Sequence, residues 1–202
     1  RFYTVLHGFT RFYTVLHGKK QKKEEAGASK KKNSYMANEL KQLPTGIQTF
    51  EKIREGNYLY VDKTELVYRL ANEHSYVFLS RPRRFGKSVL CSTLKSYFEG
   101  RRDLFEGLAM EELETEWRKH PVLLISLASM KAGTTEEFNA KISLQLRRYE
   151  EQFGIERNSD IPGERFQHLI EQAPAKTGEK TVVIIDEYDA PLLAVLHEPE
   201  KL

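Results

Sequence analysis

The chain contains three short runs that consist almost entirely of apolar or aromatic residues. They occupy residues 76–79, 122–127 (with one serine) and 182–185. Runs of this length, without regular alternation of apolar and polar residues, are typical of strands buried on both faces. We therefore predict three buried strands at these positions.

Between these runs, apolar residues recur at helical spacing. A short amphipathic helix is predicted over residues 64–70, with the Thr64 hydroxyl capping its own start. A second helix is predicted over residues 89–98, where the pattern stops at Gly100. It directly follows the first strand and the loop after it, so this part of the chain has the order strand, loop, helix.

Two further helices complete the pattern. Thr134 and Glu137 form a capping box at the start of a long helix that ends at Gly154, and another helix is predicted over residues 164–173. Strands that alternate with helices predict an α/β fold with a mainly parallel sheet and right-handed crossovers.

The loop after the first strand carries the most informative motif. Residues 81–88 read R-P-R-R-F-G-K-S, close to the phosphate-loop pattern G-x-x-x-x-G-K-[ST], except that Arg81 replaces the leading glycine. In this pattern Gly86 lets the backbone approach the phosphates, Lys87 reaches the terminal phosphates, and the Ser88 hydroxyl is a magnesium ligand. The candidate nucleotide-binding residues are Arg83, Arg84, Phe85, Gly86, Lys87, Ser88 and Val89.

A second candidate element follows the third apolar run, which ends in Asp186 and Glu187. As a Walker B element, Asp186 would hold Mg²⁺ and Glu187 would polarise the water that attacks the terminal phosphate. The alternative is a solvated strand end without a function. Together with the phosphate loop, the pair predicts binding of ATP and Mg²⁺, with Lys87 and Glu187 as catalytic residues and Ser88 and Asp186 as metal ligands.

The positive charge of the chain is confined to its N-terminal part. The chain has 32 basic and 29 acidic residues, a net charge of +3. Residues 1–35 hold nine basic and two acidic residues, which is +7, so the remainder is −4. This segment also repeats R-F-Y-T-V-L-H-G, at residues 1–8 and 11–18. We expect a disordered extension over residues 1–35 and one domain over residues 36–202; the alternative is that the extension is a basic arm that binds nucleic acid or an acidic membrane.

The remaining composition bears on location and reactivity. Residues 1–202 include no apolar stretch of the ~20 residues that span a bilayer, and the single cysteine, Cys91, excludes an internal disulfide framework. We therefore expect a soluble, cytoplasmic protein. Cys91 lies among apolar residues of a predicted helix, which favours a packing role over a nucleophilic one.

Four segments, taken in order, resemble one family. They are residues 43–47 (L-P-T-G-I), 60–64 (Y-V-D-K-T), the loop at 81–88 and residues 186–189 (D-E-Y-D). Together they resemble the AAA-ATPase-like family of bacterial proteins, which usually carry a PD-(D/E)XK nuclease-like domain further on. In that family an arginine at the first loop position is ordinary.

The resemblance implies a P-loop NTPase-type three-layer fold and assigns phosphate binding to Gly86, Lys87 and Ser88. The family's further strand and nuclease-like domain do not appear up to Leu202, so the domain is expected to be incomplete at its C-terminus, and the nuclease-like domain is expected only in a longer form of the protein. Two alternatives to ATP hydrolysis stay open: a nucleotide-gated interaction module without significant turnover, and an inactive fragment of a longer protein. The resemblance gives no role for Asp62 and Lys63, for which a surface turn before a helix is the simplest interpretation.

Overall fold

The computed structural model describes residues 41–80, 82, 84–128 and 134–190. The expected extension over residues 1–35 lies outside them, as do Arg81 and Arg83. Two parallel strands form the centre of the described part: β1 (Val122–Ser126) and β2 (Val182–Asp186). Val122 lies opposite Val182, and Ser126 lies opposite Asp186. Two of the three predicted strands and their parallel pairing are therefore confirmed.

The prediction of a strand over residues 76–79 is wrong. Tyr76 forms an isolated bridge, and residues 77–80 are extended but belong to no strand. Phe78 is 8% exposed, whereas Tyr76 is 64% exposed, so only part of the apolar run is buried. A strand needs a neighbour along its length to accept and donate ladder hydrogen bonds. Within the described residues the ladder contains only β1 and β2, so apolar character alone does not make this segment a strand.

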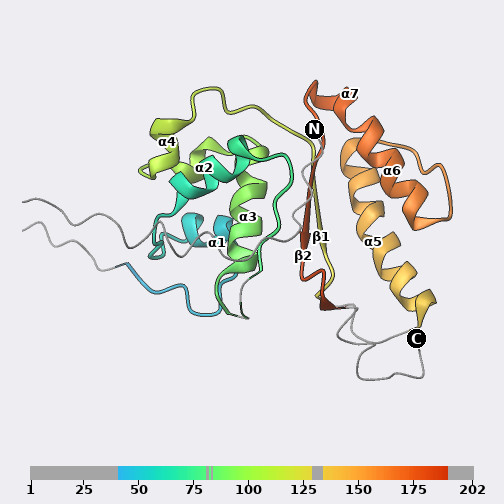
Figure 1. Ribbon diagram of the computed structural model, residues 1–202, viewed down its shortest axis with the longest axis horizontal. Coiled ribbons are helices and arrows are strands. Elements are labelled where there is room, and N and C mark those ends of the chain that lie inside the picture. The colour runs from blue at the N-terminus through green and yellow to red at the C-terminus, as the bar shows by residue number, and fades with distance from the viewer. Residues whose placement is uncertain (1–40, 81, 83, 129–133, 191–202) are drawn as a thin grey trace, which may run out of the picture.

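Helices cover both faces of the strand pair (Figure 1). One side carries α1 (Phe50–Glu55), α2 (Thr64–Glu73), α3 (Lys87–Phe98), the 3-10 helix η1 (Arg102–Phe105) and α4 (Ala109–Leu113). The other side carries α5 (Thr135–Phe153), α6 (Pro162–Gln172) and α7 (Pro174–Thr177). The four predicted helices are confirmed as α2, α3, α5 and α6, with shifted bounds. The chain is thus an α/β protein with a small parallel sheet.

The caps of α5 follow the sequence. The Thr134 hydroxyl accepts a hydrogen bond from the Glu137 amide at 3.3 Å, and Gly154 ends the helix with a left-handed φ of 60°. Glycine adopts this backbone conformation without a steric penalty from Cβ. Both ends of the longest helix are therefore set by local residues.

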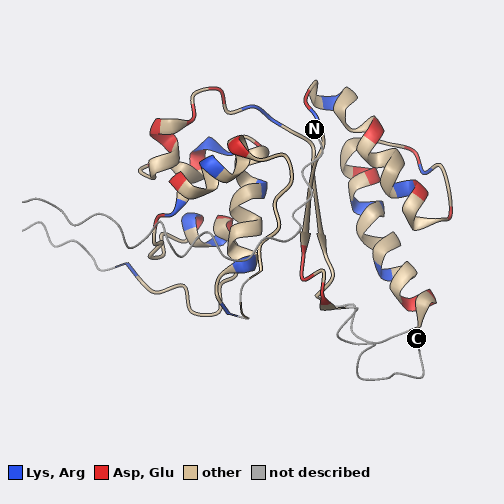
Figure 2. Cartoon of the chain, in the orientation of Figure 1, with Lys and Arg blue, Asp and Glu red and all other residues tan. Residues whose placement is uncertain are grey.

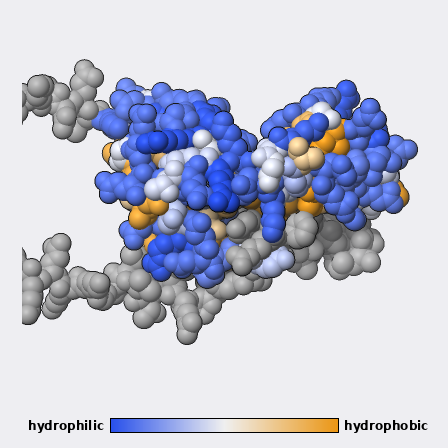
Figure 3. Space-filling view, turned by 90° about the horizontal axis from the view of Figure 1, so that it is seen from above, coloured by the Kyte–Doolittle hydropathy of each residue, from blue (hydrophilic) through white to orange (hydrophobic). Residues whose placement is uncertain are grey.

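The sheet separates two hydrophobic clusters. Val122, Val182 and Ile184 pack with residues of α2, α3 and η1, whereas Leu123 and Val183 pack with α5 and α6. Because successive side chains of a strand point to opposite faces, a strand covered on both faces must be apolar at every position. This burial on both faces explains the continuous apolar runs of β1 and β2. The molecular surface differs from this interior: most of the face seen in Figure 3 is hydrophilic.

A buried ion pair joins α5 to α6. The Arg165 guanidinium donates to both carboxylate oxygens of Glu150, at 2.8 and 2.7 Å, and also to the Ser143 carbonyl at 3.2 Å. The two side chains are only 3% and 9% exposed. The local sequence pattern around Glu150 and Arg165 does not predict this pair.

Asp62 and Thr64 connect the starts of two helices. The Asp62 carboxylate accepts hydrogen bonds from the Thr64 amide (2.8 Å) and hydroxyl (2.7 Å), and from the Ala109 amide at the start of α4 (2.8 Å). Thr64 Oγ1 also accepts a hydrogen bond from the Met110 amide at 3.0 Å. The predicted cap of α2 by Thr64 is therefore wrong: Asp62 binds the first amide of α2, and Thr64 serves α4. Asp62 and Thr64 thus have a structural role that explains part of the Y-V-D-K-T motif.

Replacing Asp62 by Ala is expected to destabilise the fold by about 1–2 kcal/mol, because helix amides lose their acceptor. Burial tends to raise the pKa of Asp62, but the hydrogen bonds from Ala109 and Thr64 outweigh it, so the pKa is lowered. A lowered pKa in the folded state stabilises the fold above the unfolded-state pKa of about 4, and this contribution is lost as pH falls through the folded-state value. Urea denaturation of the parent and Asp62→Ala at neutral and acidic pH measures both effects; an unchanged midpoint at neutral pH contradicts the capping role.

No helix in the described residues is both long and apolar enough to cross a membrane.

Candidate functional site

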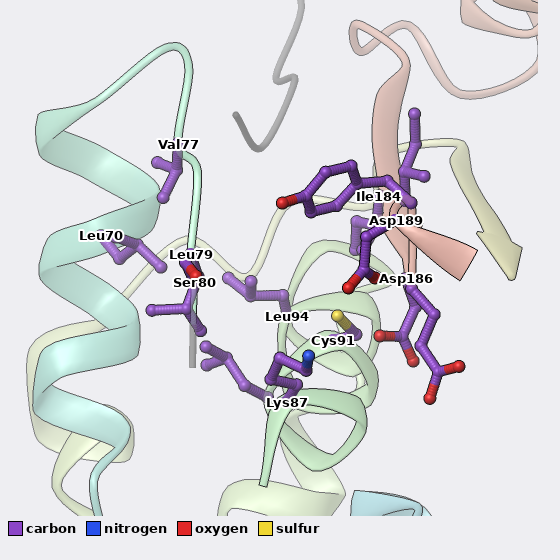
Figure 4. Close-up of a pocket in the computed structure, with 14 residues that line it drawn as sticks. Leu70, Val77, Leu79, Ser80, Lys87, Cys91, Leu94, Ile184, Asp186 and Asp189 are labelled. Carbon is purple, nitrogen blue, oxygen red and sulfur yellow. The ribbon is translucent and has the colours of Figure 1, made fainter. Parts of the chain in front are cut away.

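A cavity of about 80 Å³ lies between the first turns of α3, the extended segment 77–80 and β2 (Figure 4). Its apolar wall includes residues of α2, α3 and β2, among them Leu70, Leu94 and Ile184. Figure 4 shows the side chains of Lys87, Cys91, Asp186 and Asp189 around the same space. The polar and ionisable lining residues are Ser80, Lys87, Cys91, Asp186, Glu187, Tyr188 and Asp189.

The start of α3 supplies one wall of the cavity. Gly86 precedes the helix with a left-handed φ of 75°, and its carbonyl accepts the hydrogen bond of the Leu90 amide at 3.0 Å. The amides before Leu90 have no acceptor within the helix, and the helix dipole places partial positive charge there. A Cβ built on Gly86 would meet no atom within 4 Å, so open space lies beside this backbone. The helix start can therefore accept an anion.

The other predicted loop residues lie outside the cavity lining. Arg84 is exposed and has a left-handed φ of 68°, and Phe85 is 64% exposed. Ser88 and Val89 are half-buried, and the Val89 carbonyl accepts hydrogen bonds from the Ser92 and Thr93 hydroxyls. Within residues 84–89 the cavity lining therefore includes Lys87 alone.

The end of β2 supplies the opposite wall. The pairing of Asp186 with Ser126 fixes the strand, and the Asp186 carbonyl also accepts a hydrogen bond from the Leu127 amide at 2.9 Å. Glu187 follows with a left-handed φ of 53°, and its carbonyl accepts a hydrogen bond from the Ala190 amide at 3.0 Å. Such a backbone conformation is uncommon for a residue other than glycine and is often found at functional sites. The turn keeps Asp186, Glu187 and Asp189 in the cavity lining.

Within the described part of the chain, the charged side chains that line the cavity form no hydrogen bond or ion pair. These side chains are those of Lys87, Asp186, Glu187 and Asp189. Figure 2 shows basic residues at the start of α3 and acidic residues at the end of β2, at the same edge of the molecule. One ammonium and three carboxylates give the site a formal charge of −2 at neutral pH. A polyanionic ligand would therefore need cations with it.

In the cavity, Cys91 lies near both Lys87 and Asp186 (Figure 4). Burial raises the pKa of its thiol to about 12; the carboxylate of Asp186 acts in the same direction, and the ammonium of Lys87 opposes it. The thiol is therefore protonated at neutral pH. Because the nucleophilic form of cysteine is the thiolate, Cys91 is a poor nucleophile at this pH. This agrees with a packing role for Cys91.

The donor atoms near the cavity suit a hard cation bound together with a ligand. Carboxylate and hydroxyl oxygens are the ligands that Mg²⁺ prefers, and Mg²⁺ is usually held by one or two side chains plus phosphate oxygens and water. In the described part of the chain, no group of three or more His, Cys, Asp or Glu residues could hold a metal ion. Of the two predicted metal ligands, Asp186 lines the cavity and Ser88 does not.

Tyr188 and Asp189 were missed as site residues. They belong to the D-E-Y-D segment, but a strand pattern gives no direction to side chains beyond the strand end. The turn at Glu187 to Ala190 brings them back to the cavity. A dense group of acidic residues directly after a buried strand is the signal that could have identified Asp189.

Comparison with known proteins places this site in a family context. The model of the family described as "Predicted AAA-ATPase" matches residues 44–202. The chain is 45% identical over 161 residues to a protein of Azotobacter chroococcum mcd 1 described as "Uncharacterized protein in vnfD 5'region". This alignment covers 79% of the chain and 31% of the relative, so the chain spans about a third of the length of that protein. No solved structure matches the chain.

Proposed function

The chain belongs to the predicted AAA-ATPase family, and from this membership we propose that it binds ATP with Mg²⁺ at the cavity between α3 and β2 and hydrolyses the terminal phosphate bond. One observation carries the proposal. Lys87 and Asp186 are far apart in the sequence, yet they line one cavity, and neither side chain has a hydrogen bond or ion pair with another described residue. Unpaired charges of opposite sign across one cavity are suited to a ligand that carries both phosphate and metal.

The size of the cavity limits what it encloses. Pockets that enclose a whole small molecule usually have about 300–1,000 Å³. A cavity of about 80 Å³ is too small for a nucleotide. We therefore assign it to the phosphate end of ATP and expect the base and ribose to lie outside it.

Each residue has a distinct role in the proposed reaction. Gly86 and the first amides of α3 bind phosphate oxygens, and the Lys87 ammonium neutralises charge on the terminal phosphates. Ser88 and Asp186 are the proposed magnesium ligands; when bound, Mg²⁺ supplies positive charge to the phosphate oxygens. Glu187 orients the attacking water and accepts its proton. Arg84 adds positive charge near the phosphates, and the same role expected for Arg83 falls outside the described residues. Phe85 belongs to the loop, and Val89 lies in the first turn of α3.

The architecture supports a three-layer P-loop NTPase fold. Helices lie on both faces of a parallel strand pair, and the phosphate-loop lysine begins the helix that follows an extended apolar segment. The paired acidic residues end the second of the parallel strands. In open α/β sheets, ligands bind at the carboxyl ends of the strands, which is where Asp186 lies.

Replacing Lys87 by Ala tests the proposal. We expect ATP binding in the presence of Mg²⁺ to weaken about 10- to 100-fold, because a charged hydrogen-bond donor to phosphate is lost. Isothermal titration calorimetry measures the dissociation constants of the parent and the variant. Because the carboxylates leave the site with a negative charge, chelation of Mg²⁺ should weaken binding to the parent as well.

Lys52→Ala is the matched control, because Lys52 is exposed on α1 and does not line the cavity. It should bind ATP like the parent. Binding by Lys87→Ala at the parental dissociation constant, or no binding by the folded parent, rules out the proposed site.

A further inference from the structure

A ring contact links the extended segment before the phosphate loop to the turn after β2. The ring centroids of Phe78 and Tyr188 lie 4.9 Å apart with an interplanar angle of 62°, which is an edge-to-face arrangement. Phe78 belongs to the extended segment that leads into the phosphate loop, and Tyr188 directly follows Glu187. The contact therefore joins the backbone before Lys87 to the backbone that carries the carboxylates.

Within the described residues, no strand ladder joins the segment before Lys87 to the turn that carries the carboxylates. Residues 77–80 belong to no strand, and β2 pairs only with β1. Helix α3 packs against β2 through the hydrophobic cluster that contains Leu94 and Ile184. This packing holds the helix against the strand, and the Phe78–Tyr188 contact joins the segment before the phosphate loop to the turn after β2. A large aromatic pair at the level of the site can hold the two segments together.

The turn after β2 makes the positions of its carboxylates depend on Tyr188. Asp186, Glu187 and Asp189 flank Tyr188 in sequence, and all four residues line the cavity. The left-handed backbone of Glu187 and the hydrogen bond from the Ala190 amide to the Glu187 carbonyl set the direction in which Tyr188 leaves the strand. A shift of the Tyr188 ring would therefore move the neighbouring carboxylates with it.

We propose that Tyr188 is a positioning residue: its ring, packed against Phe78, sets the separation between the phosphate loop and the carboxylate turn, and so controls recognition of the terminal phosphate of ATP. This inference rests on the proposed function of the cavity. The β-phosphate end of ADP needs chiefly the phosphate loop, whereas the terminal phosphate of ATP lies between both walls. Loss of the ring contact should thus affect ATP more than ADP.

The test is the ratio of the ADP to the ATP dissociation constant, measured by calorimetry with Mg²⁺. Tyr188→Leu is expected to reduce the parental preference for ATP about 3- to 10-fold, the range that an aromatic pair contributes. Tyr188→Phe keeps the ring and should retain the parental ratio. The ratio compares binding rather than turnover, and a purely structural role would weaken both nucleotides equally.

A double-mutant cycle assigns the effect to the pair. Phe78→Leu should lower the ratio as Tyr188→Leu does, and the double variant should be no worse than either single variant. Tyr76→Leu is the control, because Tyr76 lies in the same segment but is 64% exposed and does not line the cavity. Losses that multiply in the double variant overturn the proposal.

The remaining outcomes are equally decisive. If Tyr188→Leu shows the parental ratio of dissociation constants, or if the parent does not prefer ATP over ADP, the positioning role is overturned. The phosphate site itself still stands in either case, provided that Lys87→Ala has lost binding. Parental binding by Lys87→Ala removes the site itself. Should Tyr188→Leu be unfolded in a thermal melt, Tyr188→Met keeps apolar bulk without a ring and is judged by the same ratio.

Discussion

Glu187→Gln is expected to lower the rate of ATP hydrolysis about 10²- to 10⁴-fold, the contribution of a positioned general base. Glutamine has almost the same shape as glutamate but cannot accept the proton of the attacking water. Binding should change little, because the phosphate loop and Asp186 are unaltered. Steady-state release of phosphate measures turnover, and calorimetry measures the dissociation constant for ATP.

Glu156→Gln is a matched control, since Glu156 is exposed after α5 and does not line the cavity. Its turnover should equal that of the parent. If the parent binds ATP but hydrolyses it no faster than Glu187→Gln does, the protein is a nucleotide-gated binding module and Glu187 has no role as a base. The same pair of measurements therefore separates the two functions that the sequence left open.

Arg165→Met is expected to lower the free energy of unfolding by about 3–5 kcal/mol. Arg165 is 3% exposed and donates to both carboxylate oxygens of Glu150, which is 9% exposed. Removing the guanidinium leaves the Glu150 carboxylate buried without its partner, and this costs far more than the pair itself contributes. The midpoint of urea denaturation, followed by circular dichroism, measures the loss.

Two further variants identify the cause. Arg165→Met combined with Glu150→Leu should recover most of the stability, because no buried charge remains. Arg69→Ala removes one partner of the exposed pair with Glu73 on α2 and should cost less than about 1 kcal/mol. A loss in Arg165→Met that matches the loss in Arg69→Ala would show that the α5–α6 pair is not effectively buried.

Local patterns predicted the elements that depend on local residues. The capping box at Thr134 and the glycine at 154 gave the ends of α5, and the continuous apolar runs gave β1 and β2, because both faces of those strands are covered. The same rule failed at residues 76–79. These residues are apolar, but they lack a neighbouring ladder in the described part of the chain. Pairing is a property of two segments, and one segment cannot specify it.

Side chains that act at a distance were also outside the reach of local patterns. Asp62 binds the Ala109 amide, and Arg165 pairs with Glu150. Nothing in the spacing of these residues predicts the contacts, because the helices that bring them together are placed by hydrophobic packing. The short elements α1, η1 and α4 were missed for a related reason: helices of four to six residues gain most of their stability from tertiary contacts.

The sequence by itself determined the chemistry available to this protein: a glycine, lysine and serine at the start of a helix, and two carboxylates at the end of a buried strand, each recognisable because the residue types and local spacing carry the signal. Only the tertiary structure decided that Lys87 and Asp186 line one cavity, that Tyr188 and Asp189 join them, and that Phe78 meets Tyr188. The reason is physical. Parallel strands and crossover helices bring distant segments together through packing on both faces of a sheet, and the direction of each side chain then depends on turns whose geometry is fixed by the whole fold.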